Sequence, residues 1–360
     1  MKPLNLLEYE PLARAKLSAM VYEYYAGGAN DEVSLRDNRA SFERWRLWPR
    51  VLRAVAERDL RADVLGERWA APIAVAPMAL QRMAHPEGEL AVARACAALG
   101  LPYVVSTMAT CTIEEIAEAA PEGLRWFQLY AFKDRAINRD LVRRAEEAGY
   151  RALVLTVDTP LLGRREGALR TDFHIPDGLR EANLRPYEQG QLADMREQGM
   201  AGQFWRTFLR EDNLSWDDVE WLQANTRLPL VLKGILRPDD AVRAAEQGVA
   251  AVMVSNHGGR QLDSVPSSLD ALPRIAEAVR GRTTLLMDGG IRRGTDVLKA
   301  LALGARAVAV GRPVLWGLAV DGQQGVEDVL RLLLDEFDLA MALSGCHNLA
   351  EITRDLVERV

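Results

Sequence analysis

Eight short apolar runs, separated by amphipathic stretches, restrict the folds open to this chain more than any other feature of its sequence. The runs lie at 73–76, 103–105, 125–129, 152–156, 230–232, 251–254, 284–287 and 307–310. Helical patterns lie between them at 88–99, 113–120, 135–148, 238–247, 269–279 and 294–303. Alternating strands and helices indicate parallel strands joined by crossover helices. Eight such units predict a closed (β/α)₈ barrel, a TIM barrel, of about 250 residues plus extensions.

An open, doubly wound α/β sheet is the competing fold. It is disfavoured because the first predicted strand is not followed by the Gly-x-Gly-x-x-Gly turn typical of such sheets. Before the barrel, residues 5–48 form a helical extension, with one helix over 12–25 that ends at Gly27-Gly28. After the barrel we expect an amphipathic helix over 326–342 and a short final helix from Leu349. The whole chain, 1–360, is predicted to be a single domain.

The connection from 158 to 228, between the fourth and fifth predicted strands, is far longer than the others. Loops longer than about 15 residues are usually functional or disordered. This one is rich in charged residues. We therefore expect part of it to be a mobile lid, and its polarity argues against a membrane-binding insertion.

The composition is that of a soluble globular protein, with 49% apolar and 27% charged residues. The net charge of −6 argues against non-specific binding of nucleic acid. There is no apolar run of membrane-spanning or signal-peptide length. The three cysteines lack metal or redox spacing, so we expect no metal site and a reducing compartment, the cytoplasm. The chain ends without the peroxisomal Ser-Lys-Leu signal.

Polar residues collect where the predicted strands end, which is where TIM barrels carry their chemistry. The strand ends read Ala76-Pro77-Met78, Ser106-Thr107-Met108, Gln128-Leu129-Tyr130, Thr156-Val157-Asp158, Lys233-Gly234, Ser255-Asn256-His257, Asp288-Gly289-Gly290 and Gly311-Arg312. A barrel built only for packing does not need so many hydrogen-bonding groups at one rim. The set suits a flat polar heterocycle, whose ring edge needs several donors and acceptors.

The strand end at 255–263, Ser-Asn-His-Gly-Gly-Arg-Gln-Leu-Asp, has the highest density of polar side chains. His257 can exchange a proton near neutral pH. Arg260 can hold a carboxylate through two parallel hydrogen bonds. We predict that His257 is a catalytic base and that Arg260 binds a substrate carboxylate. The alternative is a structural loop in which neighbouring backbone satisfies His257.

The last two strand ends indicate a phosphate site. Asp288-Gly289-Gly290 with Arg292, and Gly311-Arg312, occupy the positions where TIM barrels usually bind phosphate. Glycine amides and guanidinium groups both bind phosphate. Asp288 would not face a phosphate but could accept hydrogen bonds from ribityl or ribose hydroxyls. Combined with the ring-binding set, this pattern predicts flavin mononucleotide (FMN).

Lys233 has two interpretations. A lysine at the end of a barrel strand could form a Schiff base with a carbonyl substrate. It could instead place a cation beside a flavin ring and stabilise the anionic reduced form. A histidine and an arginine suit a carboxylate substrate better than a sugar phosphate, so we favour the flavin role.

Together these motifs resemble the FMN-dependent L-2-hydroxy acid oxidases, the family of glycolate and lactate oxidases. The stretch 255–263 matches the active-site signature of that family, and motifs at 22–28, 128–130, 156–160 and 288–294 follow in the expected order. The resemblance covers nearly the whole chain and implies oxidation of a small 2-hydroxy acid, with O2 as electron acceptor. It also implies a homotetramer or homo-octamer.

The resemblance assigns roles residue by residue. It makes His257 the base, oriented by Asp158, with Tyr130 at the substrate hydroxyl. It implies that Arg165 and Arg260 hold the carboxylate with help from Tyr24. The residues that it places at the flavin are Ala76, Pro77, Met78, Ser106, Gln128, Thr156, Lys233, Ser255, Asp288, Gly289, Gly290, Arg292, Gly311 and Arg312.

Two methionines depart from the plant-type glycolate oxidases, which carry Thr and Trp where this chain has Met78 and Met108. Methionine is apolar and adaptable, so Met108 leaves room for a methyl group on the substrate. We therefore expect L-lactate as the main substrate, with glycolate also oxidised to its 2-oxo acid and O2 reduced to hydrogen peroxide. The alternatives are a dehydrogenase of the same family that reduces a quinone or cytochrome, a lyase that uses Lys233 as a Schiff base, and a silent flavin-binding protein.

Overall fold

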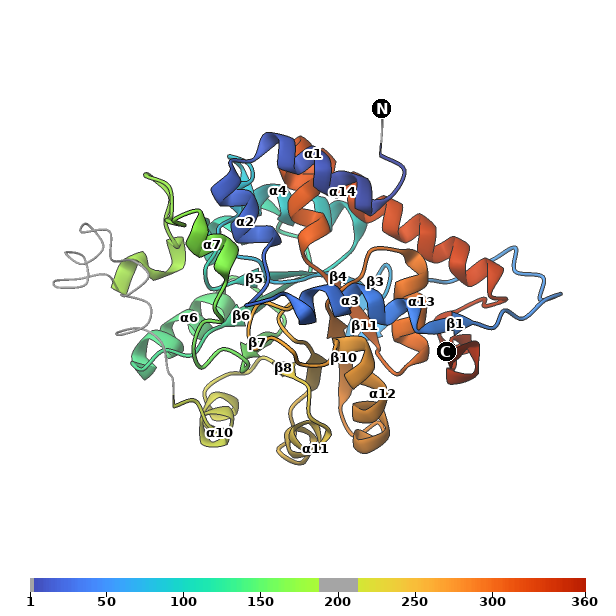
Figure 1. Cartoon of the computed structure of the whole chain (residues 1–360). Helices are drawn as coiled ribbons and strands as arrows, with labels where there is room; N and C mark the ends of the chain where they lie inside the picture. Colours follow the sequence, from blue (N-terminus) through green and yellow to red (C-terminus); the bar gives the residue numbers. More distant parts are fainter. Residues whose placement is uncertain (1–2, 188–212) are drawn as a thin grey trace.

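The protein is a TIM barrel, as a computed structural model that describes residues 3–187 and 213–360 shows (Figure 1). Eight parallel strands follow one another around the barrel in chain order, and the last pairs with the first. They are β4 (Ile73–Val75), β5 (Tyr103–Ser106), β6 (Arg125–Leu129), β7 (Leu153–Thr156), β8 (Leu230–Ile235), β9 (Ala251–Val254), β10 (Thr284–Asp288) and β11 (Ala307–Val310). The predicted strands and their order are confirmed, with ends that differ by a few residues at most.

Helices surround the barrel, and all but α10 and the first part of α14 lie where the sequence pattern predicts them. They are α4 (Gly88–Leu99), α5 (Ile113–Ala119), α6 (Arg135–Glu147), α10 (Trp216–Ala224), α11 (Pro238–Glu246), α12 (Ser268–Val279), α13 (Gly294–Ala302) and α14 (Arg312–Leu343). The helix predicted over 326–342 is the second part of α14, which begins directly after β11. Asp321 and Gly322 have non-helical dihedral angles and divide α14 in two.

The strands are buried on both faces, as parallel strands covered by helices must be. The inner faces fill the barrel with apolar side chains, among them Trp126 at the start of β6. A hairpin of β2 (Ala62–Val64) and β3 (Glu67–Trp69) brings Trp69 edge-on to Trp126, with ring centroids 5.3 Å apart. Because Trp126 lies at the amino-terminal end of its strand, the hairpin packs against that end, and the opposite rim remains for a site.

The prediction of one helix over 12–25 is wrong. The chain forms α1 (Tyr9–Lys16) and α2 (Ala19–Ala26), and α3 (Val33–Glu43) follows. Ser18 separates the first two because its backbone is extended and its hydroxyl accepts a hydrogen bond from the N–H of Val21 at 3.3 Å. Serine is a strong N-cap residue, so it begins a new helix where the apolar pattern runs on.

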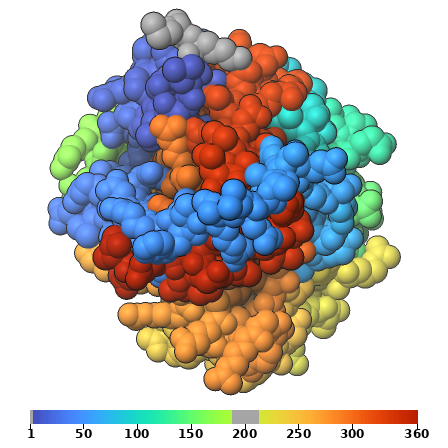
Figure 2. Space-filling view, turned by 90° about the vertical axis from the view of Figure 1, so that its right-hand side faces the viewer, coloured from blue at the N-terminus to red at the C-terminus, as the bar shows by residue number. Residues whose placement is uncertain are grey.

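The prediction of a final helix from Leu349 is also wrong. Two short 3-10 turns, η5 (Leu349–Glu351) and η6 (Arg354–Leu356), lead into β12 (Val357–Arg359), which pairs antiparallel with β1 (Trp45–Leu47). The segment after β1 then lies across the end of α14, where the N–H of Arg50 donates to the carbonyl of Ser344 at 3.2 Å (Figure 2). The carboxyl-terminal segment is therefore packed against the segment around β1, beside the barrel.

The long connection between β7 and β8 contains α7 (Glu166–Arg170), η3 (Ala182–Tyr187) and the crossover helix α10. Residues 188–212, on which much of the lid prediction falls, lie outside the described residues. In Figure 1, α7 lies beside α2, so the first part of the connection reaches the amino-terminal helices. Within 3–187 and 213–360, no helix is both long and apolar enough to cross a membrane.

Candidate active site

A cavity of about 1050 Å³ opens at the carboxyl ends of the barrel strands. Parallel strands bring these ends to one rim, so residues far apart in the sequence meet there. The predicted residues that line the cavity are Tyr24, Ala76, Pro77, Met78, Ser106, Met108, Tyr130, Thr156, Arg165, Lys233, His257, Arg260, Asp288, Gly289, Gly290, Arg292, Gly311 and Arg312. Asp158, Gln128 and Ser255 do not line it, but each forms a hydrogen bond with a residue that does.

His257 and Asp158 form a hydrogen-bonded pair across the end of β8. The imidazole Nδ1 lies 3.0 Å from Asp158 Oδ1 and 3.2 Å from Oδ2. The pair depends on Gly234, because a Cβ at that position would lie 2.5 Å from the Cβ of Asp158. A carboxylate accepts hydrogen bonds only, so Nδ1 carries the proton and Nε2 keeps its lone pair. The structure thus brings together the base and the orienting acid that the sequence predicts.

The protonation state of His257 follows from its surroundings. Burial lowers the pKa of His257 below its ordinary value of 6.5, an effect that Asp158 opposes and Lys233 reinforces. Burial works to raise the pKa of Asp158, but His257 and Lys233 outweigh it and hold that pKa below its ordinary value. The histidine is therefore neutral at pH 7 beside a charged carboxylate, the state that a general base requires.

The backbone of His257 is left-handed, with φ of 57°, which is uncommon for a residue with a side chain. The hydroxyl of Ser255 accepts a hydrogen bond from the His257 N–H at 3.0 Å and so supports this turn. Gly259 follows with φ of 74°, and a Cβ there would lie 2.6 Å from backbone atoms of Leu35 in α3. Gly259 thus lets the loop pack closely against the amino-terminal extension.

Lys233 is buried and is held by two groups at the ends of the next two strands, β9 and β10. Its Nζ lies 3.1 Å from Asp288 Oδ2 and donates to the Ser255 hydroxyl at 3.0 Å. Burial would lower the pKa of Lys233, but Asp288 and Asp158 hold it above its ordinary value. The amine is therefore a fixed cation at the rim of the cavity.

Ser106, Gln128 and Thr156 form a polar row along the ends of β5, β6 and β7. The side-chain amide of Gln128 donates from Nε2 to the Thr156 hydroxyl at 3.0 Å, and its Oε1 accepts from the Ser106 hydroxyl at 3.3 Å. All three side chains are buried. Buried polar groups are normally hydrogen-bonded, and this row keeps further donors and acceptors available to a ring edge.

Arg292 and Arg312 are half-buried and have no carboxylate partner in the ranges that the structure describes. Burial lowers the pKa of each to about 10, and repulsion from neighbouring arginines adds to this. Gly289 and Gly290 lie next to them with φ of 100° and 82°. A Cβ on Gly290 would lie 2.0 Å from the carbonyl oxygen of Asn38, so the turn presses its backbone against α3. Two positive charges held near each other in this way repel, and a bound anion would offset that repulsion.

The carbonyl groups at the end of α2 hold two arginines. Arg260 donates to the carbonyls of Gly27 at 2.8 Å and Tyr25 at 3.2 Å. Arg312 donates to the same two carbonyls at 3.2 and 3.0 Å. Arg165 donates from Nε to the carbonyl of Arg260 at 3.3 Å. Burial, together with repulsion from Arg165 and Arg312, lowers the pKa of Arg260 well below its ordinary value.

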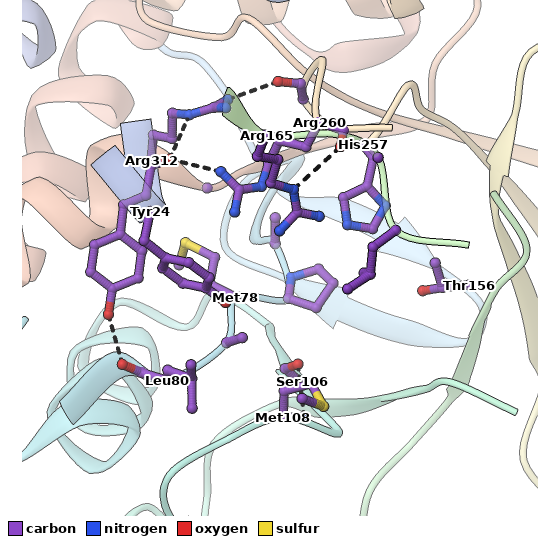
Figure 3. Close-up of a pocket in the computed structure, with 18 of the residues that line it drawn as sticks. Tyr24, Met78, Leu80, Ser106, Met108, Thr156, Arg165, His257, Arg260 and Arg312 are labelled. Carbon is purple, nitrogen blue, oxygen red and sulfur yellow. Dashed lines mark hydrogen bonds between the residues drawn. The ribbon is translucent and has the colours of Figure 1, made fainter. Parts of the chain in front are cut away.

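Apolar side chains form the rest of the cavity wall, opposite the arginines. In Figure 3 the arginines and His257 lie along one side, and Ser106 and Met108 lie on the other. The loops of Met78 and Met108 are linked, because the Leu80 N–H donates to the Met108 carbonyl at 3.1 Å. Sequence reasoning missed the further apolar lining residues Leu80, Phe132, Leu161, Leu162, Leu169, Phe173 and Leu315. The Leu161-Leu162 pair, inside an otherwise polar connection, was the available signal.

The residues present fit FMN. Asp288 Oδ1 is buried and has no hydrogen-bond partner among the described residues, so it can accept from a ribityl hydroxyl. Arg292 and Arg312 suit a phosphate group. Lys233 and the row from Ser106 to Thr156 offer a cation and polar groups to a ring edge. Fold and site together define a barrel enzyme that binds a phosphorylated flat cofactor next to an anionic substrate.

Comparison with known proteins gives the family. A family model for FMN-dependent dehydrogenases matches residues 13–359. 2-Hydroxyacid oxidase 1 of Homo sapiens is 51% identical over 358 residues, which cover 98% of this chain and 95% of the human protein. L-lactate oxidase of Nostoc sp. is 53% identical over 355 residues, which cover 97% of this chain and 96% of that oxidase. The chain belongs to the family of FMN-dependent 2-hydroxyacid oxidases.

Two further relatives extend this picture. Glycolate oxidase 3 of Arabidopsis thaliana is 49% identical over 358 residues, which cover 98% of this chain and 95% of the plant protein. The crystal structure of mandelate oxidase with (S)-2-phenylpropionate matches with a TM-score of 0.90 at 43% identity, over 100% of this chain and 99% of that one. The family and the cofactor dependence predicted from the motifs are thus confirmed.

Proposed function

We propose that this enzyme oxidises a small L-2-hydroxy acid, with L-lactate the main substrate and glycolate a second one, to the 2-oxo acid. We propose further that O2 takes up the electrons and becomes hydrogen peroxide. The observation that carries the proposal is the neutral, Asp158-oriented His257 in a cavity with Arg165 and Arg260. Neither arginine has an ion-pair partner in the described part of the chain.

Each residue has a defined task in this reaction. Arg260 and Arg165 bind the carboxylate of the substrate by charge-assisted hydrogen bonds, and Tyr24 adds a phenol to the same group. Tyr130 lies at the substrate hydroxyl. His257 Nε2 takes a proton from the substrate, and the charge that His257 gains is stabilised by Asp158. When bound, the flavin supplies the acceptor for two electrons.

Lys233, Asp288 and Arg312 hold the cofactor in this proposal. Lys233 is directed at the ring, Asp288 at the ribityl chain, and Arg292 with Arg312 at the phosphate. The raised pKa of Lys233 favours this role over a Schiff base, because a charged amine cannot attack a carbonyl carbon. A lyase that uses Lys233 is therefore disfavoured.

Three relatives are named as oxidases of 2-hydroxyacids, L-lactate and glycolate, which supports O2 as the acceptor. The apolar wall with Met78 and Met108 supports L-lactate over glycolate as the main substrate. L-Lactate carries a methyl group that glycolate lacks, and burial of that group against the wall makes binding more favourable.

The test is the visible spectrum of the purified protein before and after anaerobic addition of L-lactate. We expect yellow protein that releases FMN on denaturation and is bleached by L-lactate. Air should then restore the colour at a rate that matches turnover, with hydrogen peroxide as product. Release of FAD, or bleaching by glycolate alone, contradicts the cofactor or the substrate. Slow reoxidation in air, with fast reoxidation by a quinone or cytochrome, identifies the dehydrogenase instead.

We further propose a homotetramer or homo-octamer in the cytoplasm. Cys96, Cys111 and Cys346 are all buried and unpaired, which suits a reducing compartment. Light scattering coupled to size-exclusion chromatography measures the assembly directly, and a monomer would contradict it.

A further inference from the structure

Two aromatic rings from distant parts of the chain stack in the wall of the cavity. Tyr24 in α2 and Phe173, just after α7, have ring centroids 4.1 Å apart and planes inclined by 11°. Both line the cavity. Neither the fold nor the predicted site accounts for this stack, because Phe173 belongs to a turn that carries no other predicted function.

The other face of the Tyr24 ring is covered by an arginine. Arg260 Cζ lies 5.4 Å from the centroid of Tyr24. A ring has two faces, and Phe173 already covers one of them at van der Waals distance, so the guanidinium group occupies the second. Tyr25 adds an edge-on contact at 5.3 Å. Tyr24 is therefore held between a phenyl ring and the arginine that is proposed to bind the substrate carboxylate.

The direction of Phe173 is set by the turn that ends α7. The Phe173 N–H donates to the Ala168 carbonyl at 2.9 Å, and the Asp172 N–H donates to the Leu169 carbonyl at 3.2 Å. Asp172 is left-handed with φ of 48°. These are the two hydrogen bonds and the backbone conformation of a Schellman motif. The backbone itself thus turns Phe173 back toward α2.

Two close approaches fix α7 against α2. A Cβ on Gly167 would lie 2.6 Å from Glu23 Oε2, so the glycine lets the Glu23 side chain lie directly against α7. The N–H of Asn30 donates to the Arg164 carbonyl at 2.9 Å. Because Phe173 lies just after α7 and Arg165 just before it, the stack and one carboxylate-binding arginine belong to the same short segment.

We infer that Phe173 is a positioning residue for substrate binding, which holds the Tyr24 ring against Arg260 so that its phenol stays directed at the substrate carboxylate. This inference rests on the proposed function, in which Tyr24 and Arg260 bind that carboxylate. It adds a residue outside the predicted set and gives the first part of the long connection a role in affinity.

The test uses the FMN-loaded enzyme and two substitutions of the same side chain. Phe173→Leu removes the planar ring, and Phe173→Tyr keeps it. The probe is oxalate, a dicarboxylate whose binding to the oxidised flavoprotein is followed by the flavin spectrum. Aromatic pairs contribute enough to predict weaker oxalate binding and a higher KM for L-lactate in Phe173→Leu, by about threefold to tenfold. We expect kcat to change less than about twofold, and Phe173→Tyr to restore both constants.

A double-mutant cycle separates positioning from general packing. If Phe173 acts through Tyr24, Phe173→Leu should change oxalate binding by less than about twofold in a Tyr24→Ala background. The matched control is Arg170→Ala at the end of α7, where the arginine side chain is 77% exposed. This variant should bind oxalate like the parent. Equal losses in both backgrounds, or unchanged oxalate binding in Phe173→Leu, overturn the inference.

The two proposals fail in different ways. If the parent binds oxalate but is not reduced by any 2-hydroxy acid, the proposed function fails, and the cycle on oxalate still decides the role of Phe173. If the parent is reduced by L-lactate and the cycle is additive, only the role of Phe173 fails. If oxalate does not perturb the flavin of the parent, the carboxylate site is wrong and Phe173 has no such role.

Discussion

The two sides of the cavity are built in different ways. On the cofactor side, Lys233 in β8 binds Ser255, just after β9, and Asp288, at the end of β10. On the substrate side, Tyr24 comes from the amino-terminal extension and Arg165 from the connection after β7. Their contacts run between segments that lie more than 90 residues apart, such as Arg165 with Arg260. The barrel register positions these three cofactor-side residues, whereas the substrate side forms only when the extensions pack onto the barrel.

The largest expected effect falls where the two sides meet, at His257. Replacing His257 with Gln should leave the flavin bound but slow its reduction by L-lactate by about 10²–10⁴-fold, the usual contribution of a general base. The measurement is stopped-flow reduction under anaerobic conditions, with flavin content as the control. Near-normal reduction in this variant means that another group takes the proton.

A pair of arginine substitutions separates the two sides directly. Loss of a charge-assisted hydrogen bond lowers affinity by roughly 10- to 100-fold. Arg165→Met should therefore raise the KM for L-lactate by that factor and keep its flavin. Arg292→Met should instead weaken FMN binding by a similar factor, with a normal KM once FMN is saturating. Flavin loss in Arg165→Met, or a raised KM in FMN-saturated Arg292→Met, would contradict the assignment of these arginines to separate substrate and cofactor sides.

The pH profile tests the electrostatics shared by both sides. The pKa of His257 is lowered by burial, with Lys233 reinforcing the effect. The neutral form is the base, so kcat/KM should stay level above pH 6.5 and fall only below it, by about tenfold per pH unit once below that pKa. In Asp158→Asn the carboxylate no longer raises the pKa, so the break should move to lower pH while the plateau rate falls. A break above pH 6.5 in the parent contradicts the assigned environment.

The same division explains what the sequence could and could not predict. Residues such as Lys233 and Asp288 were found because each directly follows an apolar run, and parallel strands bring their ends to one rim. Phe173 was missed because its partner Tyr24 lies about 150 residues earlier, and no local pattern connects them. The contact depends on the Schellman turn after α7 and on the packing of α7 beside α2.

The errors in the fold have similar causes. The apolar pattern over 12–25 runs through Ser18, and the helix break there depends on a single side-chain cap. The final strand β12 was predicted as a helix because a three-residue strand gives almost no periodicity, and its partner β1 lies more than 300 residues away in the sequence. Local patterns thus predicted the repeated units of the barrel, and long-range pairing decided the extensions.

The smallest expected effect concerns Met108, on the wall opposite the arginines. Met108 and Met78 line the cavity, and a substrate methyl group buried there gains about 1 kcal/mol. One methylene discriminates between substrates by roughly 1–3 kcal/mol, so kcat/KM for L-lactate should exceed that for glycolate by about tenfold. Met108→Trp fills the space of the methyl group and should move this ratio toward glycolate, with L-mandelate poor in both enzymes. Met108→Leu keeps the bulk and serves as the matched control. A ratio that moves by less than about threefold in Met108→Trp shows that this wall does not select the substrate.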